Sequence, residues 1–207
     1  MDLKTEITRH LLEIEAVQIR TDEYFTWTSG IKSPIYCDNR LTMSYPVVRR
    51  KIADGFVELI QKNGWEPDNI AGCATAGIPH AAWLAERLNL PMVYVRSSPK
   101  GHGKGNQIEG KVEPGEKIVV IEDLISTGGS SLEVVRVLRD AGAEVLGVLA
   151  IFSYGLEKAK ENFKAAGVSV ETITGYDFLL DMLEKEKKIT NAEKNELKSW
   201  RQLLDKN

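Results

Sequence analysis

The sequence predicts an α/β protein with a central, mainly parallel sheet flanked by helices. From residue 70 onward, short continuous apolar segments alternate with segments of helical periodicity. Continuous apolar strands are typical of a parallel sheet covered on both faces, and the helices between them supply the crossover connections. The chain has 207 residues, 43% of them hydrophobic and 28% charged, which is the size and composition of one globular domain.

The expected elements follow one another in chain order. Glycines at 142 and 167 end two of the helices, and Pro79 lies in the first turn of another. The predicted strands are residues 70–73, 92–95, 118–121, 145–152 and 168–173, and the predicted helices are residues 78–88, 130–141, 156–166 and 191–204.

The first 45 residues do not follow this alternation. An amphipathic helix with Leu3, Ile7, Leu11, Ile14 and Val17 on one face is expected to precede short β segments at 24–27 and 35–37. Ser44 is the expected cap of a helix that ends at residue 63. We expect residues 1–45 to form a small lobe, with 1–207 as a single domain and 190–207 as its C-terminal helix.

Charge and cysteine content narrow the class of protein. The formal net charge is −3, whereas general nucleic-acid binders are usually basic. Neither a signal peptide nor an apolar run long enough to span a membrane is evident. Cys37 and Cys73 lack metal-ligand spacing, and we interpret them as reduced thiols of a cytosolic protein.

The segment 118–131 carries the most informative pattern. A β-branched run leads to Glu122 and Asp123, and after two apolar residues the sequence reads Ser-Thr-Gly-Gly-Ser-Ser before a helix. Two glycines let backbone N–H groups converge on an anion, and the free N–H groups of the next helix add to them. The hydroxyls of Thr127, Ser130 and Ser131 are further donors, so the segment predicts a phosphate pocket.

The two acids suggest which phosphate binds. Carboxylates accept hydrogen bonds from sugar hydroxyls, so Glu122 and Asp123 beside a phosphate pocket indicate a ribose 5-phosphate. The segment is neither a Walker loop nor a dinucleotide fingerprint. On the residues alone, an ordinary turn between a strand and a helix remains an alternative.

A basic segment follows the strand at 92–95. It carries Arg96, Lys100, His102 and Lys104, and no acid appears before Glu109. Its glycines predict a mobile loop, and its charges fit pyrophosphate, which Arg binds bidentately and Lys as a point charge. A solvated surface loop is the alternative. We assign no role to His10 or His80.

The whole run at 118–131 resembles the signature of the type I phosphoribosyltransferases. The basic loop and the segment 25–38 resemble the corresponding segments of orotate phosphoribosyltransferases of the bacterial short-form subgroup. In that family, the segment that corresponds to 25–38 forms a hood over the pyrimidine. The resemblance covers most of residues 25–152. It implies the type I phosphoribosyltransferase fold with a small N-terminal hood lobe, and transfer of ribose 5-phosphate from phosphoribosyl pyrophosphate (PRPP) to orotate in pyrimidine (UMP) biosynthesis.

The same resemblance implies the site. Arg96, Lys100 and His102 are expected to be catalytic and to bind PRPP, and Ser126 is expected to touch orotate. It also implies that Mg²⁺ is held by the donor's oxygens, without a protein metal site. The protein is further expected to be a cytoplasmic homodimer whose subunits share the basic loop, with no nucleic-acid or membrane partner. The remaining PRPP-binding residues are expected to be Glu122, Asp123, Leu124, Ile125, Ser126, Thr127, Gly128, Gly129 and Ser130.

Four positions depart from the family pattern. Thr28, Ser97 and Ala76 stand where lysines are common, and Tyr154 stands where an arginine is expected to meet the orotate carboxylate. The sequence thus leaves open which residue holds that carboxylate. The alternatives are a transferase for another base, an RNA-binding regulator on the same fold, and a nucleotide-binding module without catalysis.

Overall fold

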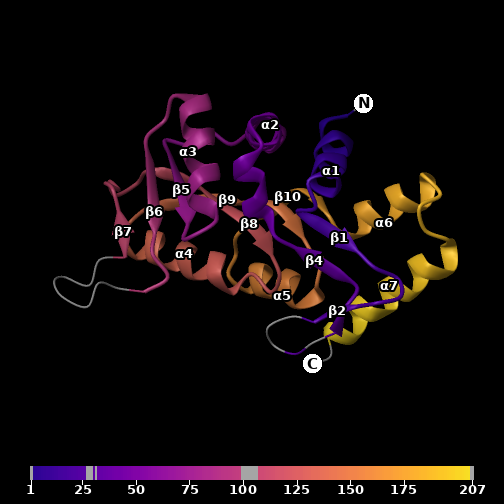
Figure 1. The fold of residues 1–207 in the computed structure, drawn as a ribbon. Coiled ribbons are helices and arrows are strands. Elements are labelled where there is room, and N and C mark those ends of the chain that lie inside the picture. The colour runs from indigo at the N-terminus through magenta and orange to yellow at the C-terminus, as the bar shows by residue number, and fades with distance from the viewer. Residues whose placement is uncertain (1, 27–29, 31, 99–106, 206–207) are drawn as a thin grey trace.

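A six-stranded sheet forms the centre of the molecule (Figure 1). The computed structural model describes residues 2–26, 30, 32–98 and 107–205. The strand order is β10-β9-β8-β5-β6-β7; all neighbours are parallel except β7, which runs antiparallel at the edge. The strands are β5 (Asn69–Cys73), β6 (Met92–Val95), β7 (Ile108–Glu109), β8 (Lys117–Ile125), β9 (Glu144–Ser153) and β10 (Val170–Gly175).

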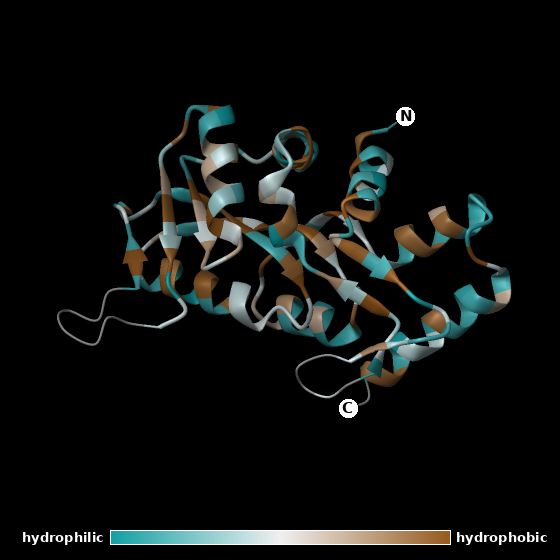
Figure 2. Ribbon diagram, in the orientation of Figure 1, coloured by the Kyte–Doolittle hydropathy of each residue, from teal (hydrophilic) through white to brown (hydrophobic). Residues whose placement is uncertain are grey.

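Helices cover both faces of this sheet, and the strands are correspondingly apolar (brown in Figure 2). Along β8, Val119 and Ile121 pack into one core cluster, whereas Ile118 and Val120 pack into the other. This alternation is the two-residue period of a strand that is buried on both sides. The first cluster includes helices α1 (Leu3–Glu13), α2 (Pro46–Lys62) and α3 (Gly77–Leu88); the second includes α4 (Gly129–Asp140) and α5 (Glu157–Ala165).

The sheet grows in two directions from its middle. After β5 the chain adds β6 on one side, and β8, β9 and β10 then follow on the other side. Strands β5 and β8 are therefore neighbours at the point where the strand order reverses. Ligands of open parallel sheets bind outside the carboxyl ends of the strands at such a point.

The N-terminal lobe consists of two small antiparallel sheets. Strand β1 (Val17–Ile19) pairs with β4 (Ile35–Cys37), and β2 (Phe25–Thr26) pairs with β3 (Lys32–Ser33). A 3₁₀ helix, η1 (Asn39–Ser44), connects β4 to α2. The lobe is not separate from the rest of the molecule, because α1 contributes buried side chains to the first core cluster.

The C-terminal helices support this lobe from outside the sheet. Helix α6 (Tyr176–Lys185) leads to α7 (Asn191–Leu204), which begins with a capping box between Thr190 and Glu193. The Trp200 indole donates a hydrogen bond to the Lys32 carbonyl at 3.0 Å, and the Tyr24 hydroxyl donates to Glu196 at 3.2 Å.

The structure departs from the sequence-based expectation at several places. Strand β8 continues to Ile125, so Glu122 and Asp123 lie within the strand, because β9 pairs with it as far as Ser153. The N-cap of α2 is Tyr45 rather than Ser44, which belongs to η1. The first helix ends at Glu13, and Val17, expected on its apolar face, lies in β1 because it pairs with Cys37 of β4. Helix α6 and strands β1, β3 and β7 were not predicted, and residues 27–29 of the expected β segment and turn lie outside the described residues. Within the described part of the chain, every helix is too short or too polar to cross a membrane.

A close approach of Trp65 to Gly147 yields a test of the packing. A Cβ atom built on Gly147 in β9 would lie 2.2 Å from the Trp65 ring. Gly147→Ala should therefore lower the free energy of unfolding by about 1–3 kcal/mol, measured by denaturant titration. Gly129→Ala is the matched control, because a Cβ there would meet no atom within 4 Å. Equal stability of the two variants would contradict this account.

Candidate active site

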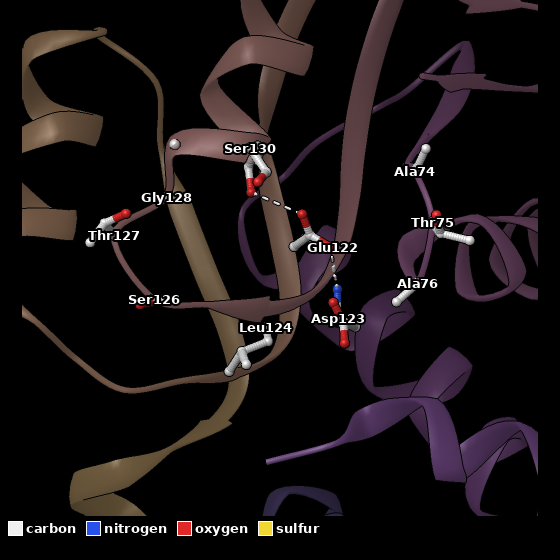
Figure 3. A pocket seen from close by; sticks show the side chains of 12 residues that line it. Ala74, Thr75, Ala76, Glu122, Asp123, Leu124, Ser126, Thr127, Gly128 and Ser130 are labelled. Atoms are coloured by element: carbon white, nitrogen blue, oxygen red, sulfur yellow. Dashed lines mark hydrogen bonds between the residues drawn. The ribbon is translucent and has the colours of Figure 1, made fainter. Parts of the chain in front are cut away.

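A cavity of about 410 Å³ lies at the carboxyl ends of β5 and β8 (Figure 3). Its walls come from the turn after β5, the end of β8 and the beginning of α4, as expected for the point where the strand order reverses. The lining residues are Ala74, Thr75, Ala76, Glu122, Asp123, Leu124, Ser126, Thr127, Gly128, Gly129, Ser130 and Ser131.

The loop between β8 and α4 is held in shape by α5. Gly128 has φ 81°, a conformation that favours glycine, and a Cβ atom there would lie 2.5 Å from the Phe163 ring. The Asn162 side-chain amide donates a hydrogen bond to the Thr127 carbonyl at 2.9 Å. These contacts fix the backbone from Thr127 to Gly129, from which α4 begins.

The first turn of α4 contains no acidic residue, so no carboxylate of its own competes for the helix N-terminus. Free N–H groups and the helix dipole give this end a positive potential, which favours an anion. Thr127 and Ser130 are exposed and add hydroxyl donors. Ser131 is buried instead, and its hydroxyl lies 3.4 Å from a Glu122 oxygen, so it points at the acidic pair rather than at the cavity mouth.

The acidic pair lies beneath this loop, with Glu122 buried and Asp123 half-buried. The Asp123 backbone N–H donates to the Glu122 carboxyl at 3.0 Å. Burial, followed by the charge of Asp123, raises the pKa of Glu122 to about 8, and burial also raises the pKa of Asp123. Burial, followed by the charge of Glu122, raises the pKa of the Cys73 thiol, which therefore stays protonated.

Residues of η1 hold the backbone of Asp123 from the side of the N-terminal lobe. The Asn39 side-chain amide donates to the Asp123 carbonyl at 2.7 Å, and the Thr42 hydroxyl donates to the Asn39 carbonyl at 2.6 Å. The Thr42 hydroxyl also lies 3.3 Å from His80 Nε2. Burial lowers the pKa of His80 to about 4, so its ring is neutral at pH 7.

The turn after β5 closes the cavity opposite the phosphate loop. The peptide bond between Ala74 and Thr75 is cis, and the Ala74 N–H donates to the Val95 carbonyl at 3.1 Å. A Cβ atom on Gly77 would lie 2.3 Å from the Ile121 carbonyl oxygen. Glycine at this position thus permits the close approach of α3 to β8.

The structure brings most of the predicted PRPP-binding residues together. Eight of the nine residues from Glu122 to Ser130 line the cavity; Ile125 does not, and its side chain packs in the second core cluster. Arg96 lies outside the lining, with its guanidinium 3.8 Å from Glu109. Lys100 and His102 fall outside the described residues. Tyr154 is buried, which raises the pKa of its phenol, and its N–H donates to the Ile125 carbonyl at 3.0 Å.

Asn39 is a site residue that sequence reasoning missed. It occurs in Asp38-Asn39-Arg40, where asparagine beside aspartate is typical of any turn. No local pattern indicates that its side chain reaches a strand 84 residues later. Only the position of η1 beside β8 reveals that contact.

Comparison with known proteins places these features in a family. Residues 45–179 match the model of the phosphoribosyl transferase domain. The chain is 58% identical to the orotate phosphoribosyltransferase of Oceanobacillus iheyensis over 98% of this chain and 100% of that protein, and 60% identical to that of Bacillus pumilus over 97% and 94%. The crystal structure of orotate phosphoribosyltransferase from Aeropyrum pernix has 31% identity and a TM-score of 0.76, covering 86% of this chain and 97% of that chain.

The burial of Glu122 leads to a pH-dependent stability. Its pKa in the folded protein, about 8, is above its ordinary value of 4.5, so the folded state binds more protons than the unfolded state between these values. Without ligand, the free energy of unfolding should fall as the pH rises from about 6.5 to 8, with a contribution from Glu122 of up to about 1.4 kcal/mol per pH unit; below about pH 6.5 the lowered pKa of His80 acts in the opposite direction. Denaturant titration across this range measures the slope.

Two variants assign that slope to its source. Glu122→Gln should remove the contribution of the buried carboxyl, so its stability should depend less on pH than that of the wild type. Glu133→Gln, in an exposed carboxyl paired with Arg136 on α4, should keep the wild-type slope. An unchanged slope in Glu122→Gln would show that the carboxyl ionises normally.

Proposed function

The chain belongs to the phosphoribosyl transferase domain family, and we propose that it transfers ribose 5-phosphate from PRPP to orotate, giving orotidine 5′-phosphate and diphosphate. The observation that carries the proposal is one cavity that joins the N-terminus of α4 to a buried acidic pair. The choice of orotate is supported by relatives of that name at 58–60% identity over nearly the whole chain. The product is a precursor of UMP.

Each part of the cavity has a proposed role in binding the donor. The backbone N–H groups and hydroxyls from Thr127 to Ser130 hold the 5′-phosphate, and the carboxyls of Glu122 and Asp123 accept hydrogen bonds from the ribose hydroxyls. Leu124 and Ile125 are the last residues of β8 and connect the acidic pair to the loop that holds the phosphate. Ser126 offers its hydroxyl to orotate. The donor is thereby held with C1 of its ribose facing the acceptor.

The reaction forms a bond from a ring nitrogen of orotate to C1 of the ribose as diphosphate leaves. Positive charge grows on the sugar and negative charge on the leaving group, so catalysis consists mainly of positioning and electrostatic stabilisation. We assign the neutralisation of diphosphate to Arg96, Lys100 and His102. Closure of the loop that carries Lys100 and His102 would exclude water, which otherwise hydrolyses the donor.

Mg²⁺ is the proposed cofactor, bound mainly through the oxygens of the donor. Among the described residues, no three His, Cys, Asp or Glu side chains are grouped so as to hold a metal ion. The carboxylates of Glu122 and Asp123 are hard oxygen ligands at the donor site and fit such an ion. Bound Mg²⁺ would add positive charge beside the departing diphosphate.

We further propose that the chain is a single domain that works as a cytoplasmic homodimer with the basic loop shared between subunits, and without nucleic-acid or membrane partners. An exposed apolar surface on η1 and the beginning of α2 supports a protein partner, because large exposed apolar groups in series often mark an interface. Its members are Leu41, Met43, Tyr45 and Val47. The two free cysteines agree with a reducing compartment.

Offering several bases separately tests the proposed reaction. The protein is incubated with PRPP and Mg²⁺ and, in turn, with orotate, uracil, adenine, guanine and xanthine, and diphosphate release is measured. Orotate alone should support rapid release. Release with another base instead would identify a different transferase, and no release with any base would favour the RNA-binding or nucleotide-binding alternatives.

Mixing two inactive variants tests both the loop and the dimer. Lys100→Ala should lower turnover by about 10²–10³-fold while donor affinity changes less, and Asp123→Asn should weaken donor binding. If the loop is shared between subunits, each hybrid dimer contains one intact site and one site with both substitutions. Random mixing makes half of the dimers hybrids, so it should restore about a quarter of wild-type activity. Lys111→Ala, in an exposed lysine beyond the loop that pairs with Glu113, is the control for Lys100→Ala and should be fully active.

Absence of recovery after subunit exchange would mean that each chain uses its own loop. Sedimentation velocity on the wild type measures the oligomeric state independently. A monomer in that experiment would contradict the homodimer without affecting the proposed reaction.

A further inference from the structure

The described lining of the cavity contains no cationic side chain, although the proposed acceptor carries a carboxylate. A carboxylate beside the acidic pair needs a positive partner, because like charges at short range repel. The position where the family commonly has an arginine is occupied here by Tyr154, which is buried and cannot supply positive charge. A cation must therefore come from a neighbouring element.

We propose that Arg40 binds the carboxylate of orotate and thereby selects this base. The inference rests on the proposed function. Arg40 directly follows Asn39, whose side chain is hydrogen-bonded to the Asp123 carbonyl at 2.7 Å, so the backbone of Arg40 is held at a fixed place beside the ribose site.

The guanidinium of Arg40 is already oriented by the protein. Its Nε and Nη2 donate to the two oxygens of Asp38 at 2.6 and 2.8 Å, and its side chain is 64% exposed. Within the described part of the chain, Nη1 makes no hydrogen bond. Asp38 thus fixes the plane of the guanidinium and leaves donors on one edge for a ligand, as planar recognition of a carboxylate requires.

The surroundings of Arg40 suit a pyrimidine ring. Tyr36 in β4 lies two residues before Asp38, whose carboxylate accepts hydrogen bonds from the Arg40 guanidinium. The Tyr36 ring is 39% exposed and lies 5.7 Å from the Phe25 ring, measured between centroids. It offers an aromatic face for the base between Arg40 and the ribose site.

Arg20 is the rival cation, since it lies over the Phe25 ring, 4.3 Å from its centroid. Its backbone N–H donates to the Pro34 carbonyl at 2.8 Å, whereas Arg40 is linked to Asp123 through its neighbour in the chain. Lys32 donates to the Thr26 hydroxyl at 2.7 Å within the β2–β3 hairpin. Arg40 is therefore the cation that the hydrogen-bond pattern ties to the ribose site.

Two nucleotides that differ only in the carboxylate test the assignment. Orotidine 5′-phosphate and uridine 5′-phosphate share the ribose and phosphate, so calorimetry with each isolates the carboxylate contribution. Arg40→Gln should weaken orotidine 5′-phosphate binding by about tenfold to a hundredfold and leave uridine 5′-phosphate affinity unchanged. Arg40→Lys should retain part of the preference. Arg136→Gln, in an exposed arginine paired with two acids on α4, should behave as the wild type.

Each contrary result has a distinct meaning. Equal weakening of both nucleotides in Arg40→Gln, or loss of the preference in Arg20→Gln alone, would overturn the assignment of the carboxylate to Arg40. If the wild type makes orotidine 5′-phosphate from orotate and Arg40→Gln keeps the preference, only this inference fails. If the wild type makes no product from orotate and binds the two nucleotides equally, both this inference and the proposed function fail.

Discussion

The burial of two adjacent carboxyl groups at the end of β8 is the constraint around which the site is organised. Glu122 is buried and Asp123 is half-buried, burial disfavours the charge of both, and the charge of Asp123 further disfavours that of Glu122. The protein stabilises the Glu122 carboxyl with two hydrogen-bond donors, namely the Asp123 N–H and the Ser131 hydroxyl. A ligand rich in hydroxyl groups, or one that brings a cation, satisfies the two carboxyls further.

The fold holds this strained arrangement from three directions. Helix α5 fixes the phosphate loop through Asn162 and Phe163, and the turn after β5 forms the opposite wall. From the N-terminal lobe, Asn39 binds the backbone of Asp123. Segments far apart in the sequence therefore meet at one strand end, and displacement of any of them would move the carboxyls relative to the phosphate pocket.

The C-terminal helix extends this support to the lobe. Trp200 and Glu196 of α7 bind the backbone of Lys32 and the side chain of Tyr24, on either side of the β2–β3 hairpin. Tyr176 of α6 in turn donates to the Leu197 carbonyl at 3.0 Å. A helix whose sequence shows only an apolar seam and mixed charges thus helps to position the segment expected to cover the base.

The sequence by itself determined the α/β alternation, the glycine-containing loop before α4 and the acidic pair, because each depends on neighbouring residues. Hydrophobic periodicity reports burial locally, and Thr-Gly-Gly-Ser before a helix carries its own backbone chemistry. Tertiary structure alone decided that Ser131 turns toward Glu122, that Ile125 faces the core, and that Asn39 binds the backbone of Asp123. These outcomes depend on strand register and on contacts across 84 residues, which no local pattern encodes.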